Sequence, residues 1–337
     1  MMGLRAIVVC VVASILSFAS LCQAAAPGFA SSGQQGVAAG TAALAYAPDG
    51  TLYLGQNDGP ITVISPTGQR SQLDVSGATL HSIGGMMVAN GQLYVTDNKG
   101  WGDGLGDLYA INPATGLATT VLSGVDAITD VAVAPDGRIY VTDAAGINYD
   151  TGAPIGKLWE VAYDSASSSY LSRTIVDGLY YMAGVGIDHS GNVIFQQANG
   201  SFAGEVYRLD VSHNGSLVSY GTPVLLAGGL SASFDMIMDA QDDIFVSGVG
   251  GVFELNRDGA GGFTGSAWAL DGADYTTSLA FLNGSVPFGP FAGDDSGKLT
   301  YIAGYNSPNI VTVTALPEPA SLVLLASGLL GLVTRRR

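Results

Sequence analysis

Val131-Ala132-Val133-Ala134-Pro135-Asp136-Gly137-Arg138-Ile139-Tyr140-Val141 is the stretch of sequence that decides the fold. Two apolar runs flank a Pro-Asp-Gly turn, and the second run contains an aromatic residue. Runs rich in β-branched and aromatic residues form strands, and a glycine supplies the backbone conformation that a tight turn needs. The stretch therefore predicts a β-hairpin.

The same unit occurs six times along the chain, although the last copy has Pro287 where the aromatic strand should run. The copies are residues 44–54, 87–95, 131–141, 185–195, 236–246 and 279–288. Their turn residues, 50, 91, 137, 191, 243 and 284, lie 41 to 54 residues apart. One four-stranded propeller blade takes ~40–50 residues, so six turns predict six blades.

The second half of each unit alternates apolar and polar residues, which is typical of a half-buried strand. We expect third strands at residues 60–64, 106–111, 156–161, 204–209, 251–255 and 297–302, and outer fourth strands at 119–122, 173–176 and 310–313. A meander of this kind cannot bury both faces alone, so it stacks on its neighbours around a ring. The sequence predicts an all-β, six-bladed β-propeller of four-stranded antiparallel blades over residues 41–315; a β-sandwich would not explain six spaced copies.

The N-terminus has the pattern of a secretory signal peptide over residues 1–26, with its helix. Arg5 gives a positive start, residues 6–21 are apolar, and small residues follow, so we expect a signal peptidase to cut after Ala25 or Ala26. Both cysteines, Cys10 and Cys22, fall inside this segment. The exported chain would therefore have neither disulfides nor a cysteine metal site. Residues 27–40 are expected to be a linker.

The C-terminal segment, residues 316–337, has three parts. Pro317, Glu318 and Pro319 are followed by an uncharged apolar run at 320–334 and then by Arg335, Arg336 and Arg337. The prolines favour extended backbone. At ~1.5 Å per residue the run spans about 22 Å as a transmembrane helix, and terminal arginines can offset the shortfall against roughly 30 Å of hydrocarbon. The alternatives are a permanent anchor and a helix of the core.

In this order the three parts resemble the PEP-CTERM sorting signal of Gram-negative bacteria. The resemblance implies that an exosortase recognises the Pro-Glu-Pro triplet of an exported protein and removes the tail. It also implies transient anchoring in the inner membrane, only through this tail, followed by release to the cell surface or the extracellular medium. Arginines at the end of a span favour a cytoplasmic C-terminus, which agrees with export of the rest.

Charge restricts the partners of the exported part. Removing the four terminal arginines leaves 8 of 12 basic residues, and removing Glu318 leaves 27 of 28 acidic ones, a net charge near −19. Such a surface repels nucleic acid and anionic lipid, so we expect no nucleic-acid partner.

The repeats also resemble six-bladed propellers of the NHL and SMP-30/gluconolactonase-like type, which carry similar Pro-Asp-Gly turns. Lactonases of that type are implied to hold a divalent metal in the central channel with a Glu of the first blade plus Asn and Asp of later blades. The glutamates of this domain, Glu160, Glu205 and Glu254, instead fall in expected third strands. We expect them to point to solvent, so the family's metal site is not carried over.

Acidic residues are expected to gather on one face of the propeller, on two sets of loops. These are Asp58, Asp97, Asp103, Asp107, Asp143, Asp150, Asp294 and Asp295 after second strands, and Asp126, Asp130, Asp235 and His81 before first strands. Asp97, Asp103 and Asp107 form the densest group, in a glycine-rich loop that could wrap calcium. The alternative is that Asp and Gly only form turns there. Trp101, in the same loop, is a candidate for stacking on a sugar or for local packing.

The sequence thus predicts an exported surface or matrix propeller that is not an enzyme. Its role would be to bind a glycan such as an exopolysaccharide, a cation, or a surface protein. The alternative function is a metal-dependent, lactonase-like hydrolase that uses Asp and Asn in the channel, and a third is a purely structural module. The few histidines, His81, His189 and His213, lie in different units and argue against a histidine site.

Overall fold

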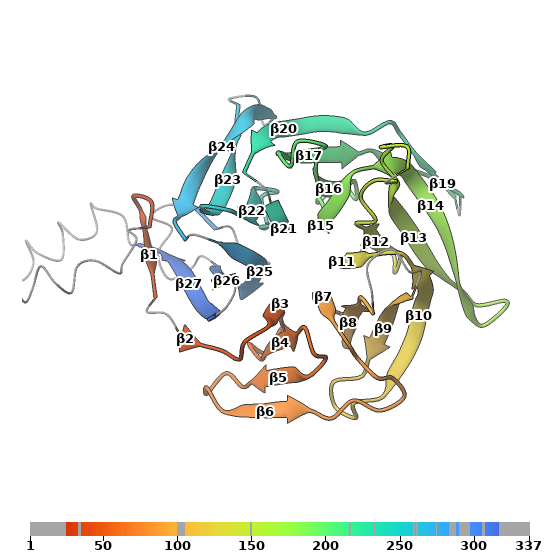
Figure 1. The fold of residues 1–337 in the computed structure, drawn as a ribbon, viewed down its shortest axis with the longest axis horizontal. Coiled ribbons are helices and arrows are strands. Elements are labelled where there is room, and N and C mark those ends of the chain that lie inside the picture. The colour runs from red at the N-terminus through yellow and green to blue at the C-terminus, as the bar shows by residue number, and fades with distance from the viewer. Residues whose placement is uncertain are drawn as a thin grey trace, which may run out of the picture.

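The computed structural model describes residues 25–32, 35–99, 105–148, 150–215, 217–231, 233–258, 260, 262–273, 275–282, 288–289, 297–304 and 307–316. These residues form strands, turns and loops, without a helix. The strands make six antiparallel blades around a central axis, which confirms the predicted propeller (Figure 1). The expected signal helix and transmembrane helix, within residues 1–24 and 317–337, lie outside the described residues.

Four blades take their strands in chain order. They are blade 1, β3 (Thr41–Tyr46), β4 (Leu52–Gln56), β5 (Ile61–Ile64) and β6 (Arg70–Leu73); blade 2, β7 (Ile83–Ala89), β8 (Gln92–Asp97), β9 (Gly106–Ile111) and β10 (Ala118–Val125); blade 3, β11 (Ile128–Val133), β12 (Ile139–Asp143), β13 (Gly156–Asp164) and β14 (Ser169–Leu179); and blade 5, β21 (Ser233–Met238), β22 (Ile244–Gly248), β23 (Gly251–Arg257) and β24 (Phe263–Asp271). In each, the first strand lies nearest the axis (Figure 1).

Blade 4 has an insertion before its outer strand. Its strands are β15 (Tyr181–Ile187), β16 (Val193–Ala198), β17 (Gly204–Leu209) and β20 (Val224–Leu230), and the hairpin β18 (Val211–Asn214) and β19 (Leu217–Tyr220) comes between the last two. A single parallel bridge, Ala227 to Gly265, joins β20 to β24 of blade 5.

Blade 6 is completed by the N-terminus, which the sequence did not predict. It consists of β25 (Thr276–Leu282), β26 (Lys298–Ala303), β27 (Asn309–Ala315) and β1 (Phe29–Ser31), and β2 (Gln35–Gly36) also pairs with β27. Residues 297–302 therefore belong to the second strand and 310–313 to the third, and the expected linker at 27–40 supplies the fourth. This pairing gives β27 a backbone partner that it would otherwise lack as an edge strand.

The Pro-Asp-Gly turn forms as predicted. Gly137 has φ 88°, and its amide donates to the carbonyl of Ala134 over 2.9 Å. Asp136 Oδ1 accepts the amide of Arg138 at 3.1 Å. In blade 5 the left-handed position is Asp242, with φ 60°, so the predicted turn centre at residue 243 is one residue late. Asp tolerates that conformation better than most side chains do.

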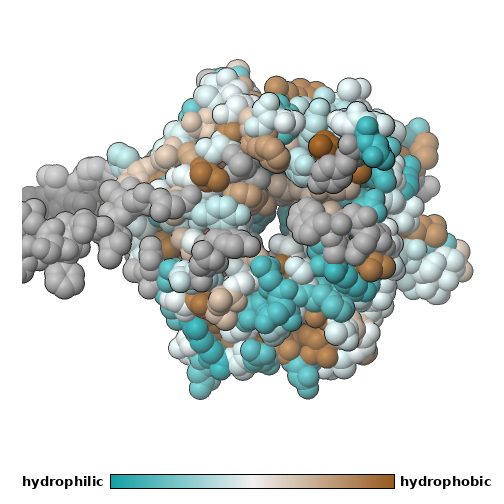
Figure 2. Space-filling view, in the orientation of Figure 1, coloured by the Kyte–Doolittle hydropathy of each residue, from teal (hydrophilic) through white to brown (hydrophobic). Residues whose placement is uncertain are grey.

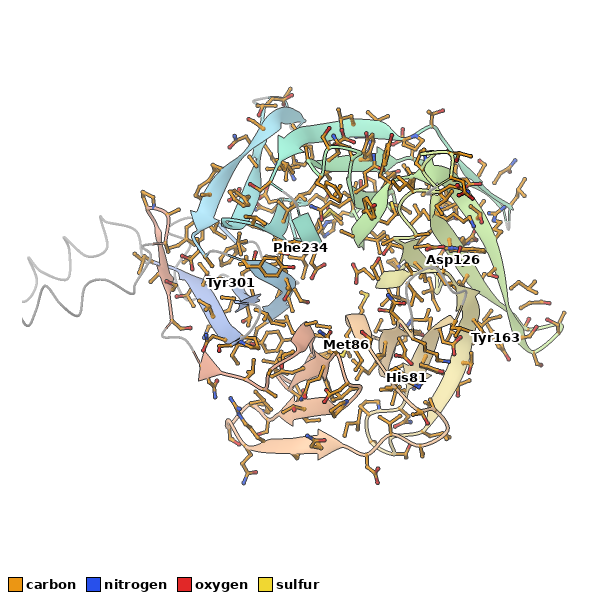
Figure 3. All side chains as sticks on the ribbon, in the orientation of Figure 1. His81, Met86, Asp126, Tyr163, Phe234 and Tyr301 are labelled. Atoms are coloured by element: carbon orange, nitrogen blue, oxygen red, sulfur yellow. The ribbon has the colours of Figure 1, made fainter. Side chains whose placement is uncertain are left out.

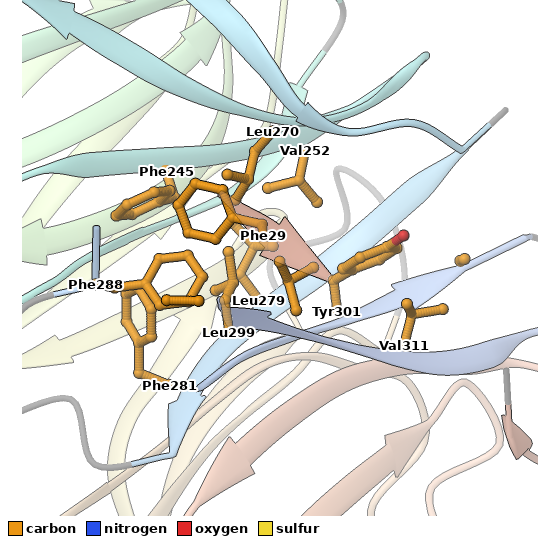
Figure 4. Packing of buried hydrophobic residues seen from close by; sticks show 13 residues of the cluster. Phe29, Phe245, Val252, Leu270, Leu279, Phe281, Phe288, Leu299, Tyr301 and Val311 are labelled. Atoms are coloured by element: carbon orange, nitrogen blue, oxygen red, sulfur yellow. The ribbon is translucent and has the colours of Figure 1, made fainter. Parts of the chain in front are cut away.

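The hydrophobic core is divided into six clusters, each between neighbouring blades. Between blades 5 and 6, Phe288 packs against Phe245 with ring centroids 5.5 Å apart and against Phe29 of β1 at 5.0 Å (Figure 4). Tyr53 and Tyr94 are buried in such clusters. Because residues 25–316 contain the closed ring of blades and its core, we expect this segment to fold as a unit.

Candidate active site

The inner strands of the six blades share a position next to a register shift in each strand. A bulge of this kind redirects a side chain, and at Asp130, Asp235 and Ser278 the side chain lines the central pocket. The residues at this position, in blade order, are Ala43, Gly85, Asp130, Gly184, Asp235 and Ser278. Three of them therefore have no polar side chain, and three carry a carboxylate or a hydroxyl.

The polar members of the ring each accept a backbone amide of the following blade. Asp130 Oδ2 accepts Val185 N at 2.9 Å, and Asp235 Oδ2 accepts Leu279 N at 2.7 Å. Ser278 Oγ accepts Leu44 N at 3.1 Å. These bonds fix the carboxylates to the scaffold and add to the other hydrogen bonds that connect neighbouring blades.

Asp235 accepts two further hydrogen bonds. Met236 N donates to its Oδ1 over 2.6 Å, and Ser278 Oγ lies 3.1 Å from its Oδ2. The backbone of Asp130 is held by Thr142, whose Oγ1 accepts the Asp130 amide at 2.9 Å and donates to the carbonyl of Ala183 at 2.8 Å. A hydroxyl on β12 thus stabilises the bulge that aims Asp130 at the axis.

The two glycines of the ring leave room for this arrangement. A Cβ on Gly85 would lie 2.4 Å from Asp130 Oδ1, and one on Gly184 would lie 2.4 Å from the amide nitrogen of Met236. Real Cβ atoms do not approach other atoms so closely, so any side chain at these positions would displace the carboxylates or their backbone.

Burial and mutual repulsion separate the acidities of the two carboxyl groups. Burial raises the pKa of Asp235 to about 6, against the opposing effect of its hydrogen bonds from Leu279, Met236 and Ser278. Burial also raises the pKa of Asp130 well above its usual range, and the negative charge of Asp235 raises it further. Both carboxyls therefore keep their protons to a higher pH than an ordinary aspartic acid does.

Both carboxylates open on a pocket of about 610 Å³. Its apolar walls include Met86, Met236 and Met238, and Figure 3 shows Met86 beside the axis. The entrance lies on the turn face, meaning the face that carries the turns between first and second strands, and includes His189 and His213. His189 Nδ1 lies 2.8 Å from Asp242 Oδ1, and this hydrogen bond raises the pKa of His189.

The acids predicted as a calcium site lie on the opposite face, the loop face, which carries the loops between second and third strands. Asp97 Oδ1 accepts the amides of His81 and Ser82, each at 2.8 Å. Asp107 accepts the hydroxyl of Tyr109 at 2.7 Å and pairs with Lys99. Asp97 and Asp107 are register partners on β8 and β9, and their described contacts are those of structural caps.

Two members of the predicted loop site, Trp101 and Asp103, lie outside the described residues, and so do the sorting residues Pro317, Glu318, Pro319 and Arg335 to Arg337. The calcium and stacking roles stay predictions. Asp143, on the same loop face, is buried and accepts Ala127 N at 3.1 Å. Asp97 and Asp143 thus satisfy backbone amides where the chain enters a blade.

The prediction that the three glutamates point to solvent is wrong. Glu160 is buried and pairs with Arg138 and Arg173. Glu205 accepts the hydroxyl of Tyr207 at 2.7 Å, and burial raises the pKa of Glu254 to about 7. Third strands in this ring are covered by the next blade and by the fourth strand. The polar residues that alternate with apolar ones along a third strand therefore do not point to solvent.

From the sequence, Asp130 and Asp235 were predicted only as two of the many acidic residues on one face of the propeller. A stronger signal was present, because each stands inside an apolar inner strand, in Ile128-Thr129-Asp130-Val131 and Phe234-Asp235-Met236. A charged residue within a buried strand is rare unless it has a specific partner.

Comparison with known proteins gives different kinds of match for the C-terminal tail and for the propeller. Residues 315–337 match the PEP-CTERM protein-sorting motif, which implies export, a membrane-associated tail and processing by an exosortase. No curated protein matches the chain. In the part of the chain that the structure covers, no helix is long and apolar enough to cross a membrane.

Solved structures match the propeller at low sequence identity. The PQQ-bound aldose sugar dehydrogenase of Streptomyces coelicolor is 14% identical, with a TM-score of 0.60, over 86% of this chain and 99% of that one. A gluconolactonase of Xanthomonas campestris is 15% identical, with a TM-score of 0.58, over 88% of both chains. The calcium-binding protein regucalcin of Agrobacterium tumefaciens is 12% identical, with a TM-score of 0.57, over 86% and 96%.

These findings show a β-propeller fold similar to that of gluconolactonases and regucalcin, in a chain whose C-terminal residues match the PEP-CTERM sorting motif. They also correct the expectation that the chain is not an enzyme. That expectation rested on the missing family metal site, whereas the fold matches structures named as a sugar dehydrogenase and a gluconolactonase.

The pocket does not fit the cofactors that these names imply. Calcium takes six to eight oxygen ligands, but the described residues contain no group of three His, Cys, Asp or Glu side chains that could hold a metal. The oxygens of Asp130 and Asp235 already accept backbone amides. PQQ is an anionic quinone, and none of the described pocket residues is Lys or Arg.

Proposed function

We propose that this exported propeller hydrolyses small uncharged sugar lactones in the pocket of its turn face, without a metal. The observation that carries the proposal is the pair of channel carboxyls, Asp130 and Asp235, which line one pocket and whose pKa values are both raised by burial, that of Asp130 further by the charge of Asp235. Pairs of titratable groups whose surroundings separate their pKa values provide an acid and a base in one site. The likeness of the fold to a gluconolactonase supports the substrate class.

Each carboxyl has a distinct role in lactone opening. Asp235 accepts a proton from water while the water oxygen forms a bond to the lactone carbonyl carbon. Asp130 donates its proton to the ring oxygen as the bond between that oxygen and the carbonyl carbon breaks, so that the oxygen leaves as an alcohol. Water and lactone become a hydroxy acid, and the proton on Asp235 then returns to Asp130.

The pocket suits a compact, uncharged substrate. Methionine walls adapt to the apolar edge of a sugar ring, and the volume of about 610 Å³ is in the range of small-molecule sites. After hydrolysis the product ionises. The negative charge on Asp235 and the acidic surface of the protein then repel it, which favours release over inhibition by product.

The site of action follows from the sorting motif. The motif implies export, and we propose that the signal peptide at residues 1–26 starts that export and that exosortase cleavage after anchoring delivers the propeller to the cell surface. The substrate would then be met outside the cytoplasm. Lactones formed there by oxidation of aldoses belong to the class that this pocket accepts.

A pH-stat assay on residues 25–316 tests the proposal, with glucono-1,5-lactone as substrate and EDTA present. Spontaneous hydrolysis is subtracted with a heat-denatured sample. We expect turnover that EDTA leaves unchanged, that rises as the pH passes about 6, where Asp235 ionises, and that declines again once Asp130 loses its proton. No turnover above background, or turnover abolished by EDTA, would refute the proposal.

A further inference from the structure

The loop face carries two aromatic pairs at the entries of adjacent inner strands. Tyr181 and Phe202 of blade 4 stack with ring centroids 5.3 Å apart at 20°, and Phe234 of blade 5 meets Tyr275 of blade 6 at 4.7 Å. Phe202 is 60% exposed and Phe234 is 37% exposed. Figure 3 places Phe234 close to the axis. We call these four residues the aromatic patch; it lies across the ring from the entrance of the pocket.

Phe202 is held in a conformation that a phenylalanine rarely adopts. Its φ is 59°, in the left-handed region where glycine is favoured. The surrounding turn enforces this conformation: Phe202 N donates to the carbonyl of Asn199 over 2.7 Å, and Asn199 Oδ1 accepts the amides of Ser201 and Ala203. Strain of this kind concentrates at functional sites, and here it serves to present the ring to solvent.

The support beneath Phe202 is rigid. Tyr181 packs directly on the backbone of Gly146, where a Cβ would lie 2.3 Å from the ring. Gly146 therefore lets Tyr181 lie flat between blade 3 and Phe202. Asn199 is itself fixed, because its Nδ2 donates to Glu205 Oε1 over 2.8 Å. The aromatic patch is thus pre-organised, which reduces the entropy lost when a ligand binds.

The chemistry around the patch selects the kind of ligand. Exposed acids on the same face, Asp58, Asp150 and Asp177, oppose anionic polymers and anionic lipids. Ser201, next to Phe202, is polar and exposed, and it suits a ligand with hydroxyls rather than an acyl chain. The space-filling view of Figure 2 shows hydrophilic and hydrophobic residues interspersed over the face of the ring that it presents.

We propose that the aromatic patch binds an uncharged polysaccharide, whose sugar rings stack on Phe202 and Phe234. Flat aromatic rings fit the apolar faces of sugar rings, while the ring hydroxyls remain available to the neighbouring polar groups and to water. The site is separate from the hydrolytic pocket, so polymer binding would retain the enzyme on a matrix while the pocket stays open on the other face.

Affinity electrophoresis of residues 25–316 tests this proposal in gels that contain hydroxyethyl cellulose, xyloglucan or dextran, with alginate as the anionic comparison. We expect at least one uncharged polymer, and not alginate, to retard the protein. Phe202→Gly should weaken that retardation about tenfold, the loss expected when one stacked ring is removed. Its melting temperature should stay equal or rise, because glycine accepts the left-handed backbone.

The matched control is Tyr163→Ala. Tyr163 is 57% exposed on the outer hairpin of blade 3, away from the patch, and its replacement should not change retardation (Figure 3). The proposal is overturned if none of the three uncharged polymers is bound, or if alginate binds as strongly. It is also overturned if Phe202→Gly binds like the wild type, or if the two variants lose binding equally. Sedimentation with phosphatidylcholine vesicles would identify a lipid surface instead and equally overturn it.

Discussion

Asp143 on the loop face and Asp235 in the channel are both carboxylates that accept backbone amides, yet only one lies in a site able to do acid–base chemistry. Burial raises the pKa of each. Asp143 caps the entry of blade 3 through the amides of Ala127 and Ala145. Asp235 lines an open pocket and has a second carboxyl, Asp130, within electrostatic reach. Burial alone makes a structural carboxylate; a partner and a pocket add a possible function.

The largest expected effect is a difference in catalytic rate between variants of Asp235 and variants of Asp143. Asp235→Asn should lower kcat/KM for lactone hydrolysis about 100- to 10,000-fold, because the general base is lost while the amide oxygen still accepts the Leu279 amide. Asp143→Asn should change the rate less than about twofold, since Asp143 lies outside the pocket. Steady-state kinetic assays of both variants measure this difference in kcat/KM. Equal losses in the two variants would remove the distinction drawn between the two carboxylates.

The pH dependence of the free energy of unfolding should show the property that Asp235 and Asp143 share, which is a raised pKa. A carboxyl whose pKa rises from 3.8 to about 6 on folding loses about 3 kcal/mol of relative stability as the pH rises from about 4 to above 6. Asp235→Asn should therefore gain on the wild type by about that amount between pH 4 and pH 7 in urea unfolding. Asp143→Asn should gain with the same sign, because burial raises its pKa as well. A constant difference across pH would show that Asp235 is not perturbed.

Thr142→Val tests how the channel position is built. The substitution keeps the shape of the side chain but leaves the amide of Asp130 and the carbonyl of Ala183 without their partner. We expect a loss of about 1–3 kcal/mol in the free energy of unfolding, together with a lower rate. Thr120→Val, at an exposed position on the outer strand β10, is the control and should change neither. Unchanged activity in Thr142→Val would mean that the bulge does not position Asp130.

The smallest expected effect concerns strain on the two faces. Phe202→Gly should stabilise the protein by about 1 kcal/mol, because a bulky side chain at φ 59° is strained. Gly137→Ala, in the turn of blade 3 with φ 88°, should destabilise it by about 1 kcal/mol for the same reason in reverse. Thermal melting measures both, and destabilisation by Phe202→Gly would show that packing of the ring outweighs its backbone strain.

Most of the fold could be predicted from the sequence because each blade repeats its own local signals. The turn at Gly137 and the inner and second strands around it needed only neighbouring residues. The closure of blade 6 could not be predicted, since pairing of Phe29 with Ala315 joins segments at opposite ends of the chain. Residues 297–302 then moved from third to second strand, because the order of strands within a blade depends on that closure.

The site was harder to predict than the fold. Asp97 and Asp107 stand in a conspicuous acidic loop, but backbone amides and Lys99 occupy their described oxygens. Asp130 and Asp235 are 105 positions apart in sequence and meet only because blades 3 and 5 surround one axis. Composition indicates loops that are dense in acidic residues. The pairing of Asp130 with Asp235 arises only when the ring of blades closes, so composition does not indicate it.

Difference infrared titration of the protonated carboxyl band tests the central claim most directly, with wild type compared against Asp130→Asn and Asp235→Asn. We predict that the neutral-carboxyl signal near pH 7 is smaller in Asp130→Asn than in the wild type, the remainder coming from Glu254 with its pKa of about 7, while Asp235 still titrates near 6 in that variant. In Asp235→Asn the pKa of Asp130 should fall, because the neighbouring negative charge is gone. If all three proteins lose the same carboxyl signal below pH 5, the channel holds two ordinary carboxylates and no acid–base pair.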